Sequence, residues 1–199
     1  FGSDSTAEPV STVIIPGWGK AASSQTPLPA PDARLLHPAI RDLAPGIEAQ
    51  LVQWAGEAQE IGTFVLYDLS EPEEMEDVVL TAERFDDQLQ LIGYRMPDDS
   101  AQCADEACSI LTYWRVLAPV QEPRRFFLHA KAGDELVAQH DGLDAPAQWW
   151  QAGDFLLQEH HLSPLQGEEI ELRLGVYNPQ TGRRLQTPDG EDYYLLQQP

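Results

Sequence analysis

The residues of this chain best suited to chemistry are five histidines, two cysteines, five tryptophans and 33 carboxylates. None falls into the spacing of a catalytic signature, because the chain has no Gly-x-Ser-x-Gly elbow and no His-Glu-x-x-His pair. Its one Gly-x-Gly-Lys run, residues 17–20, lacks the spacing and the hydroxyl of a phosphate loop. With so many carboxylates, an acid pair at glycosidase distance would arise by chance and is no evidence for hydrolysis. We predict no catalytic residue.

The spacing of the histidines favours a structural role in the fold over metal binding. His160 and His161 are neighbours in a run that predicts a strand, so their side chains point to opposite faces and cannot easily share one ion. His129 and His140 flank a predicted hairpin and can approach each other across the strands. We favour partly buried, hydrogen-bonded imidazoles over metal ligands, and we predict neither a metal site nor a cofactor.

Three aspartates offer oxygen atoms of the kind that Ca²⁺ prefers. Asp141 and Asp144 belong to an Asp-Gly-Leu-Asp run, and Asp154 follows ten residues later. Their spacing is not that of the twelve-residue calcium loop. Because Asp-Gly is a common turn dipeptide, we predict a turn here instead of a cation site.

The two cysteines, Cys103 and Cys108, have four residues between them in an acidic, polar stretch. This separation suits a small local disulfide, which we favour over free thiols. Two thiols are too few for a structural metal site, and the spacing is not the Cys-x-x-Cys of a redox pair. A disulfide would imply an oxidising, extracytoplasmic location.

The tryptophans supply the only candidate ligand site. Trp114 lies inside a predicted strand and is expected in the core, whereas the pair Trp149 and Trp150 stands just before one, near a loop. Adjacent tryptophans at such a place predict one buried ring and one half-buried ring. An exposed ring can stack on a sugar face, so Trp149 and Trp150 are the candidate ligand-binding residues.

Charge excludes two classes of partner. The 199 residues carry 12 Lys and Arg against 33 Asp and Glu, a net charge of −21. So acidic a chain lacks the basic face that a nucleic acid or an anionic membrane surface requires. No apolar run approaches the roughly 20 residues of a membrane helix, so we expect no direct membrane insertion. The first residue is Phe1, and we expect a processed protein or a piece of a longer one.

The first part of the chain predicts a small α/β subdomain. We interpret residues 1–9 as a leader or expression remnant, residues 10–72 as the subdomain, and residues 73–82 as an acidic linker. Within the subdomain the pattern predicts strand, helix, strand and helix, at residues 10–16, 38–43, 49–54 and 61–69.

Residues 83–199 predict an antiparallel immunoglobulin-like β-sandwich, which makes the chain as a whole α+β. Ile170, Leu172, Leu174 and Val176 alternate with polar residues or glycine, as expected for one buried and one wet face. A hairpin loop is expected at residues 178–182. Short runs of this kind recur between turn signals, at residues 89–95, 109–117, 125–130, 135–140, 155–161, 169–177 and 193–197.

A series of motifs carries a family resemblance. In order along the chain they are Leu91-Ile-Gly-Tyr94, Leu111-Thr-Tyr-Trp-Arg-Val-Leu-Ala-Pro-Val120, Phe127-Leu-His129, Leu136-Val-Ala-Gln-His-Asp-Gly142, Trp150-Gln-Ala-Gly153 and Leu172-Arg-Leu-Gly-Val-Tyr-Asn-Pro-Gln-Thr-Gly-Arg-Arg-Leu185. The series resembles the C-terminal β-sandwich of bacterial membrane glycosyltransferases that use polyprenyl-phosphate sugars and are akin to protein mannosyltransferases. With the stretches 50–57 and 62–66, the resemblance covers residues 49–197.

The resemblance implies a cellular location and a parent protein, but no catalytic residue in this chain. In that family the catalytic acids lie in loops of the membrane portion, so none is carried over and this fragment is not expected to be an enzyme by itself. The implied location is extracytoplasmic, periplasmic or at the cell surface, tethered through the parent protein. The implied partners are a glycan acceptor, which the domain would orient, or the membrane domain of the enzyme, which it would stabilise. Two alternatives stay open: an independent cell-surface module that binds carbohydrate or protein, and a small hydrolase that uses clustered carboxylates.

Overall fold

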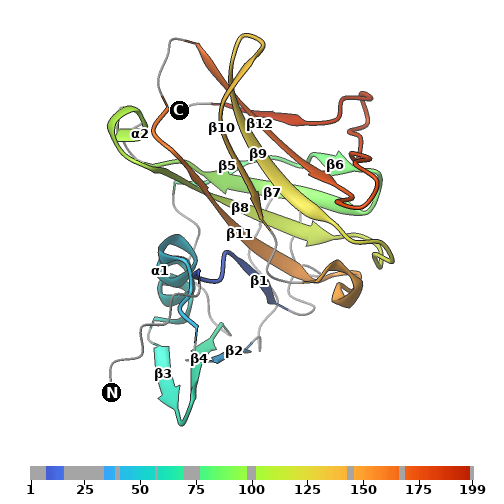
Figure 1. The fold of residues 1–199 in the computed structure, drawn as a ribbon. Coiled ribbons are helices and arrows are strands. Elements are labelled where there is room, and N and C mark those ends of the chain that lie inside the picture. The colour runs from blue at the N-terminus through green and yellow to red at the C-terminus, as the bar shows by residue number, and fades with distance from the viewer. Residues whose placement is uncertain are drawn as a thin grey trace.

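The computed structural model of this chain describes residues 8–15, 34–38, 41–56, 58–69, 77–97, 102–142, 146–165 and 169–197. About half of these residues lie in the strands of antiparallel β-sheets. Figure 1 shows a four-stranded sheet above a larger sheet, with a helix and a small third sheet on the far side of the larger one.

The larger sheet has six strands. Five of them follow the order β1 (Thr12–Ile15), β11 (Phe155–Leu162), β8 (Cys108–Val116), β7 (Leu89–Arg95) and β5 (Val79–Leu80), and β6 (Arg84–Phe85) also pairs with β7. Every residue of β11 except His161 is buried, because one face of this strand meets the opposite sheet and the other meets the N-terminal elements.

The second sheet has the order β10 (Glu135–Gly142), β9 (Arg125–Ala132), β12 (Ile170–Tyr177) and β13 (Tyr194–Leu196). Phe126 and Leu128 of β9 alternate inward with the period of two that a strand imposes. They meet the larger sheet at Trp114, whose ring centroid lies 4.8 Å from that of Phe126. The main core therefore fills the space between the two sheets.

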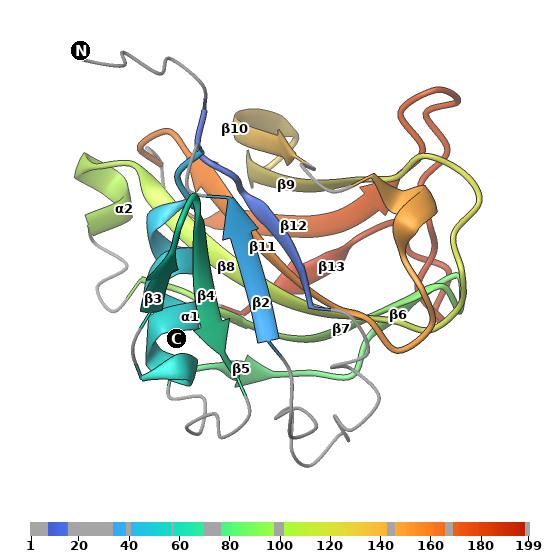
Figure 2. The ribbon, with the colours of Figure 1, turned by 90° about the horizontal axis from the view of Figure 1, so that it is seen from below.

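A second core lies on the outer face of the larger sheet. Helix α1 (Pro45–Ala55) places Ile47, Leu51 and Trp54 against Tyr113 and Phe155 of that sheet. The centroid of the Trp54 ring is 6.0 Å from that of Phe155. A three-stranded sheet, β2 (Arg34–Pro38), β4 (Phe64–Asp68) and β3 (Ala58–Ile61), adjoins the helix (Figure 2).

Three element predictions for the N-terminal part were wrong. Residues 49–54 belong to helix α1, not to a strand, and residues 61–69 form most of the β3–β4 hairpin, not a helix. In the predicted helix 38–43, Pro38 ends β2 and residues 41–43 are not helical. Pro45 starts α1, since proline suits the first helical turn, where its missing N–H needs no partner.

The reason is that short apolar runs suit a strand or a helix equally well. Ile47, Leu51 and Trp54 stand at helical spacing, and this spacing matches the face that α1 buries. In the predicted helix 61–69, Gly62 adopts a φ of +63° and turns the chain back on itself. Its conformation splits the run into two paired strands.

The seven strands predicted between residues 89 and 197 are confirmed, with bounds that differ by at most two residues. Gly182 of the expected loop adopts a φ of +73°. In addition, β1 pairs with β11, from Thr12 opposite Gln158 to Ile15 opposite Phe155. The larger sheet thus runs across the boundary predicted between residues 10–72 and 83–199. Most of the predicted leader 1–9 and part of the predicted linker 73–82 lie outside the described residues.

Candidate functional site

Trp149 and Trp150 have opposite environments. Trp149 is the last residue of the short 3-10 helix η2 (Ala147–Trp149), and Trp150 is the residue that follows it, ahead of β11. Trp150 is fully buried and stacks on Phe126 with ring centroids 5.8 Å apart, whereas 67% of Trp149 is exposed. The backbone N–H groups of Trp149 and Trp150 donate to Pro146 and Ala147, each at 3.0 Å. The buried ring and these bonds fix the turn that presents Trp149, so a ligand could touch Trp149 but not Trp150.

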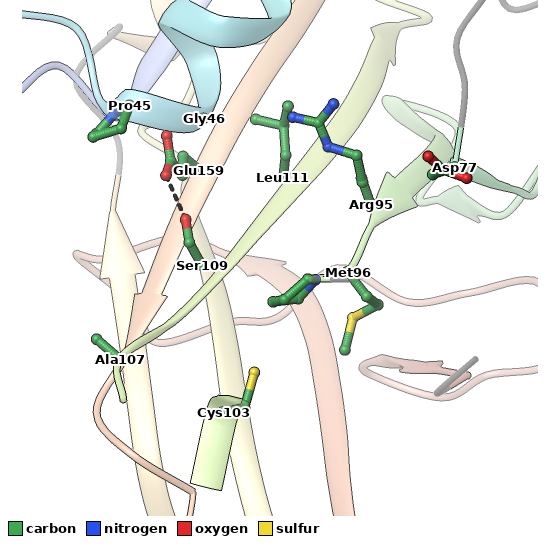
Figure 3. A pocket seen from close by; sticks show the side chains of 11 residues that line it. Pro45, Gly46, Asp77, Arg95, Met96, Cys103, Ala107, Ser109, Leu111 and Glu159 are labelled. Atoms are coloured by element: carbon green, nitrogen blue, oxygen red, sulfur yellow. Dashed lines mark hydrogen bonds between the residues drawn. The ribbon is translucent and has the colours of Figure 1, made fainter. Parts of the chain in front are cut away.

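The second candidate is a cavity of about 570 Å³ beside the start of α1, here called the helix-end pocket (Figure 3). Residues of β7, β8, β11 and α1 line it. The residues that line it include Pro45, Gly46, Asp77, Arg95, Ser109 and Glu159.

Glu159 is the buried carboxylate of this pocket, with 1% of its surface exposed. The N–H of Ile47 donates to Glu159 Oε2 at 3.0 Å, and the hydroxyl of Ser109 donates to Oε1. The N-cap position of α1 is Ala44, which has no side-chain acceptor. Glu159 therefore provides, from a distant strand, the oxygen and the negative charge that a helix N-terminus favours.

The neighbourhood of Glu159 does not form a nucleophilic triad. The Ser109 hydroxyl donates its hydrogen bond to Glu159 Oε1, and His161 Nε2 lies 3.7 Å from the same oxygen. A serine nucleophile needs the imidazole between hydroxyl and carboxylate, and here the carboxylate stands in the middle. This arrangement anchors the helix and does not activate the hydroxyl.

Gln50 provides a second anchor between α1 and the sheet. Its Oε1 accepts a hydrogen bond from Tyr113 Oη at 2.6 Å and another from Arg95 Nη1 at 3.2 Å. Burial raises the pKa of the Tyr113 phenol far above its usual value, although the charge of Arg95 opposes this shift. The phenol stays protonated and keeps donating to Gln50.

The histidines are held by partners within the fold. His129 Nε2 lies 3.3 Å from Asp141 Oδ1. His140 Nδ1 lies 3.3 Å from His160 Nδ1. Each of the two histidines expected to approach each other therefore contacts a different residue. Burial, followed by the charges of His140 and His161, lowers the pKa of His160 well below its usual value. Burial also lowers the pKa of His129, and Asp141 opposes that shift. His160 is buried and His161 faces solvent, as the strand predicted.

The expected turn at Asp141 and Gly142 was wrong, because both residues end strand β10 and pair with Phe127 and Phe126 of β9. Asp154 is buried and accepts a hydrogen bond from the N–H of Gln151 at 2.7 Å. Asp144 lies outside the described residues. Within the described ranges, no group of three or more His, Cys, Asp or Glu side chains is arranged to hold a metal ion.

Cys103 and Cys108 are joined by a disulfide. Cys103 belongs to the short helix α2 (Gln102–Asp105), and Cys108 is the first residue of β8. Both are buried against the main core, and Cys103 also lines the helix-end pocket. The bridge thus fixes one wall of that pocket.

These elements define a β-rich protein with two large antiparallel sheets, one of them backed by a helix and a small third sheet. Neither a family model nor a curated protein matches the chain. In the part of the chain that the structure describes, no helix has the length and apolar character needed to cross a membrane.

Sequence reasoning did not single out Glu159, Gln50 or Arg95. One signal for Glu159 exists in the sequence: Gln158, Glu159 and His160 interrupt an apolar strand that is buried on both faces. Buried polar side chains need hydrogen-bond partners. Three consecutive polar residues in such a strand therefore mark contacts on both of its faces.

Proposed function

We propose that this chain is an extracytoplasmic, immunoglobulin-like β-sandwich with an N-terminal helical layer, and that it is a non-catalytic C-terminal domain of a membrane glycosyltransferase. In this proposal it orients the glycan acceptor through Trp149 and stabilises the parent enzyme. The observation that carries the glycan contact is the exposure of Trp149 on a turn held by the buried ring of Trp150.

The positions of the family-like motifs support this proposal. They fall on β7, β8, β9, β10 and β12 and on the turn before β11. Several of their residues, such as Leu91, Trp114 and Leu174, are buried in the main core. The motifs that carry the resemblance thus include residues that pack the core of the two sheets. Trp149 lies just before one of these motifs and faces solvent.

Tryptophan fluorescence of the purified chain, titrated with a panel of oligosaccharides, tests the glycan contact. Trp54, Trp114 and Trp150 are buried, so a saccharide should act mainly on the emission of Trp149. Trp18 lies outside the described residues, and the variant Trp149→Phe provides the baseline for its signal. We expect Trp149→Ala to weaken binding at least tenfold, about 1.4 kcal/mol, and calorimetric titration measures this because the variant lacks the fluorescent reporter.

The matched control is Leu136→Ala, which removes another exposed apolar side chain from a different strand. It should leave binding unchanged. Flat titrations across the panel, or equal binding by the wild type and Trp149→Ala, would remove Trp149 from the proposal.

The parent protein is tested separately, with an antibody against this domain on fractionated native cells. We expect a band much larger than 22.2 kDa, in the membrane fraction and resistant to carbonate extraction. A soluble or secreted band near 22.2 kDa would instead indicate the alternative, an independent cell-surface module that binds carbohydrate or protein.

A further inference from the structure

A row of five side chains crosses the outer face of the larger sheet, with one residue from each of five neighbouring strands. The strands are β6, β7, β8, β11 and β1, and their pairing aligns, in that order, Arg84, Gln90, Arg115, Phe155 and Ile15. Phe155 and Ile15 are buried in the second core, whereas Arg115 is half-buried and Arg84 is exposed. Figure 2 shows this face, with β6 well to the side of α1. Along this row, the second core therefore ends beside Arg115.

Arg115 is a partly desolvated cation for which the described residues provide no counter-charge. Its Nε is covered by neighbouring atoms and has no hydrogen-bond partner. No ion pair among the described residues includes its guanidinium. Burial lowers the pKa of Arg115, and the charge of Arg84 lowers it further. A buried charge is costly unless it is paired, so this position favours a bound anion.

Arg84 adds a second positive charge on the same face. Its Nη1 lies 3.6 Å from Asp87 Oδ1, and the two side chains are 56% and 88% exposed, so this ion pair is weak. Gln90 lies between the two arginines and is uncharged. Neighbouring strands are about 4.8 Å apart, so the Arg84 and Arg115 backbones stand about 10 Å from each other. Two side chains of this length can converge on one group above Gln90.

From this arrangement we propose that Arg115 and Arg84 bind the phosphate group of a small, soluble phosphomonoester. A guanidinium presents its N–H donors in a planar fork that matches the oxygens of a phosphate. Such charge-assisted hydrogen bonds are stronger where water is partly excluded. A phosphomonoester carries a charge of about −1.5 to −2 at pH 7, so one group balances both arginines.

The net charge of the chain favours a soluble source for this phosphate. At −21, the chain is repelled by an anionic membrane surface, whereas a single small anion interacts mainly with the charges within a Debye length of it, about 8 Å at physiological ionic strength. The proposal goes beyond the glycan contact and does not depend on it, because it uses neither Trp149 nor the turn that holds Trp149.

The test is a calorimetric titration of the chain with inorganic phosphate, in a buffer free of phosphate and sulfate whose ionic strength is held constant with sodium chloride. We expect saturable binding by the wild type. Arg115→Gln should weaken it by about tenfold or more, because it removes charge-assisted hydrogen bonds. Arg84→Gln should weaken it by about threefold, because this side chain is more exposed.

Urea unfolding separates a loss of binding from a loss of folding. Without phosphate, Arg115→Gln should be at least as stable as the wild type, because the substitution removes a desolvated and repelled charge. Added phosphate should stabilise the wild type more than this variant, since a ligand that binds only the folded chain raises its stability.

Arg173→Gln is the matched control. It removes the same charge from the second sheet, where Arg173 Nη2 lies 2.6 Å from Glu171 Oε2. Its affinity for phosphate should equal that of the wild type. The absence of saturable binding by the wild type, unchanged affinity in a folded Arg115→Gln variant, or an equal loss in Arg173→Gln would each overturn the proposal.

Sedimentation with vesicles of phosphatidylcholine and phosphatidic acid distinguishes the two sources of a phosphate group. We expect the chain to stay in the supernatant. Sedimentation of the wild type that Arg115→Gln abolishes would overturn the soluble source and assign the phosphate to a lipid headgroup.

Discussion

At the scale of single residues, Gly175 leaves room for the Phe127 ring to lie directly against the backbone of the second sheet. It lies opposite Phe127 on the neighbouring strand, and a Cβ atom at Gly175 would stand 2.4 Å from the Phe127 ring. Phe127 is almost fully buried beneath Arg184, whose guanidinium carbon lies 4.4 Å from the ring centroid. The ring therefore has little room to move away.

We expect Gly175→Ala to lower the free energy of unfolding by about 2 kcal/mol, because the added methyl group overpacks this contact. Urea unfolding followed by fluorescence measures the change. Phe127→Leu in the same chain should recover part of the loss, since the smaller side chain frees the space. Strictly additive losses in the double variant would show that the ring does not cause the strain.

Glu159 is the second residue for which the structure gives a specific expectation. In Glu159→Gln one carboxylate oxygen becomes an amide donor, so either Ile47 N–H or the Ser109 hydroxyl loses its acceptor, and the negative charge at the start of α1 disappears. We expect a loss of about 1–3 kcal/mol in the free energy of unfolding.

Hydrogen exchange should show this loss first in α1, the element that Glu159 anchors. Glu171→Gln is the control, since its partly exposed ion pair with Arg173 should contribute less than about 1 kcal/mol. Equal losses in the two variants would mean that Glu159 has no special role in holding the helix.

At the scale of elements, the disulfide ties helix α2 to the first residue of β8. The two cysteines are separated by five positions. In the chain-entropy model, closing so short a loop stabilises the folded state by about 2 kcal/mol. We expect the free energy of unfolding to fall by that amount when a reductant is added, as measured by urea unfolding with and without the reductant.

Cys103→Ala combined with Cys108→Ala should show a loss of at least this size and should respond no further to reductant. Because both cysteines are buried in the main core, this variant also loses some packing. If the reductant has no effect on the wild type, the bridge contributes nothing to stability.

At the scale of the whole molecule, burial of His160 between β11 and the second sheet makes stability depend on pH. Its folded pKa lies well below the unfolded value of 6.5, so below about pH 6.5 the unfolded chain binds more protons than the folded one. Stability is therefore complete above pH 6.5 and declines as the pH falls toward the folded pKa. The slope from one such histidine is at most about 1.4 kcal/mol per pH unit.

Unfolding of the chain between pH 7.5 and 5, set by buffers of constant ionic strength (roughly the range in which histidine titrates), measures this slope. His160→Gln should show a smaller slope than the wild type. His37→Gln is the control because His37 lies in the N-terminal sheet and contacts the carbonyl of Arg41. The same slope in the wild type and His160→Gln would exclude His160 as the source.

The sequence by itself determined most strands of the two large sheets, although β5, in the predicted linker, and β6 were not predicted. Residues such as Leu172, Leu174 and Val176 alternate with a period of two, and this pattern is local, so it indicates a strand wherever the partner strands lie. The burial of Trp114 followed from the same reasoning. A pair such as Trp149 and Trp150 also indicates two different environments, without saying which ring would face solvent.

Only the tertiary structure decided the N-terminal elements and the candidate sites. Residues 49–54 suit a strand or a helix, and the outer face of the larger sheet, which accepts Ile47, Leu51 and Trp54 together, selects the helix. Glu159 caps that helix from 112 positions away, and His140 meets His160 across two sheets. Such contacts depend on which surfaces pack together, and no periodicity along the chain encodes that choice.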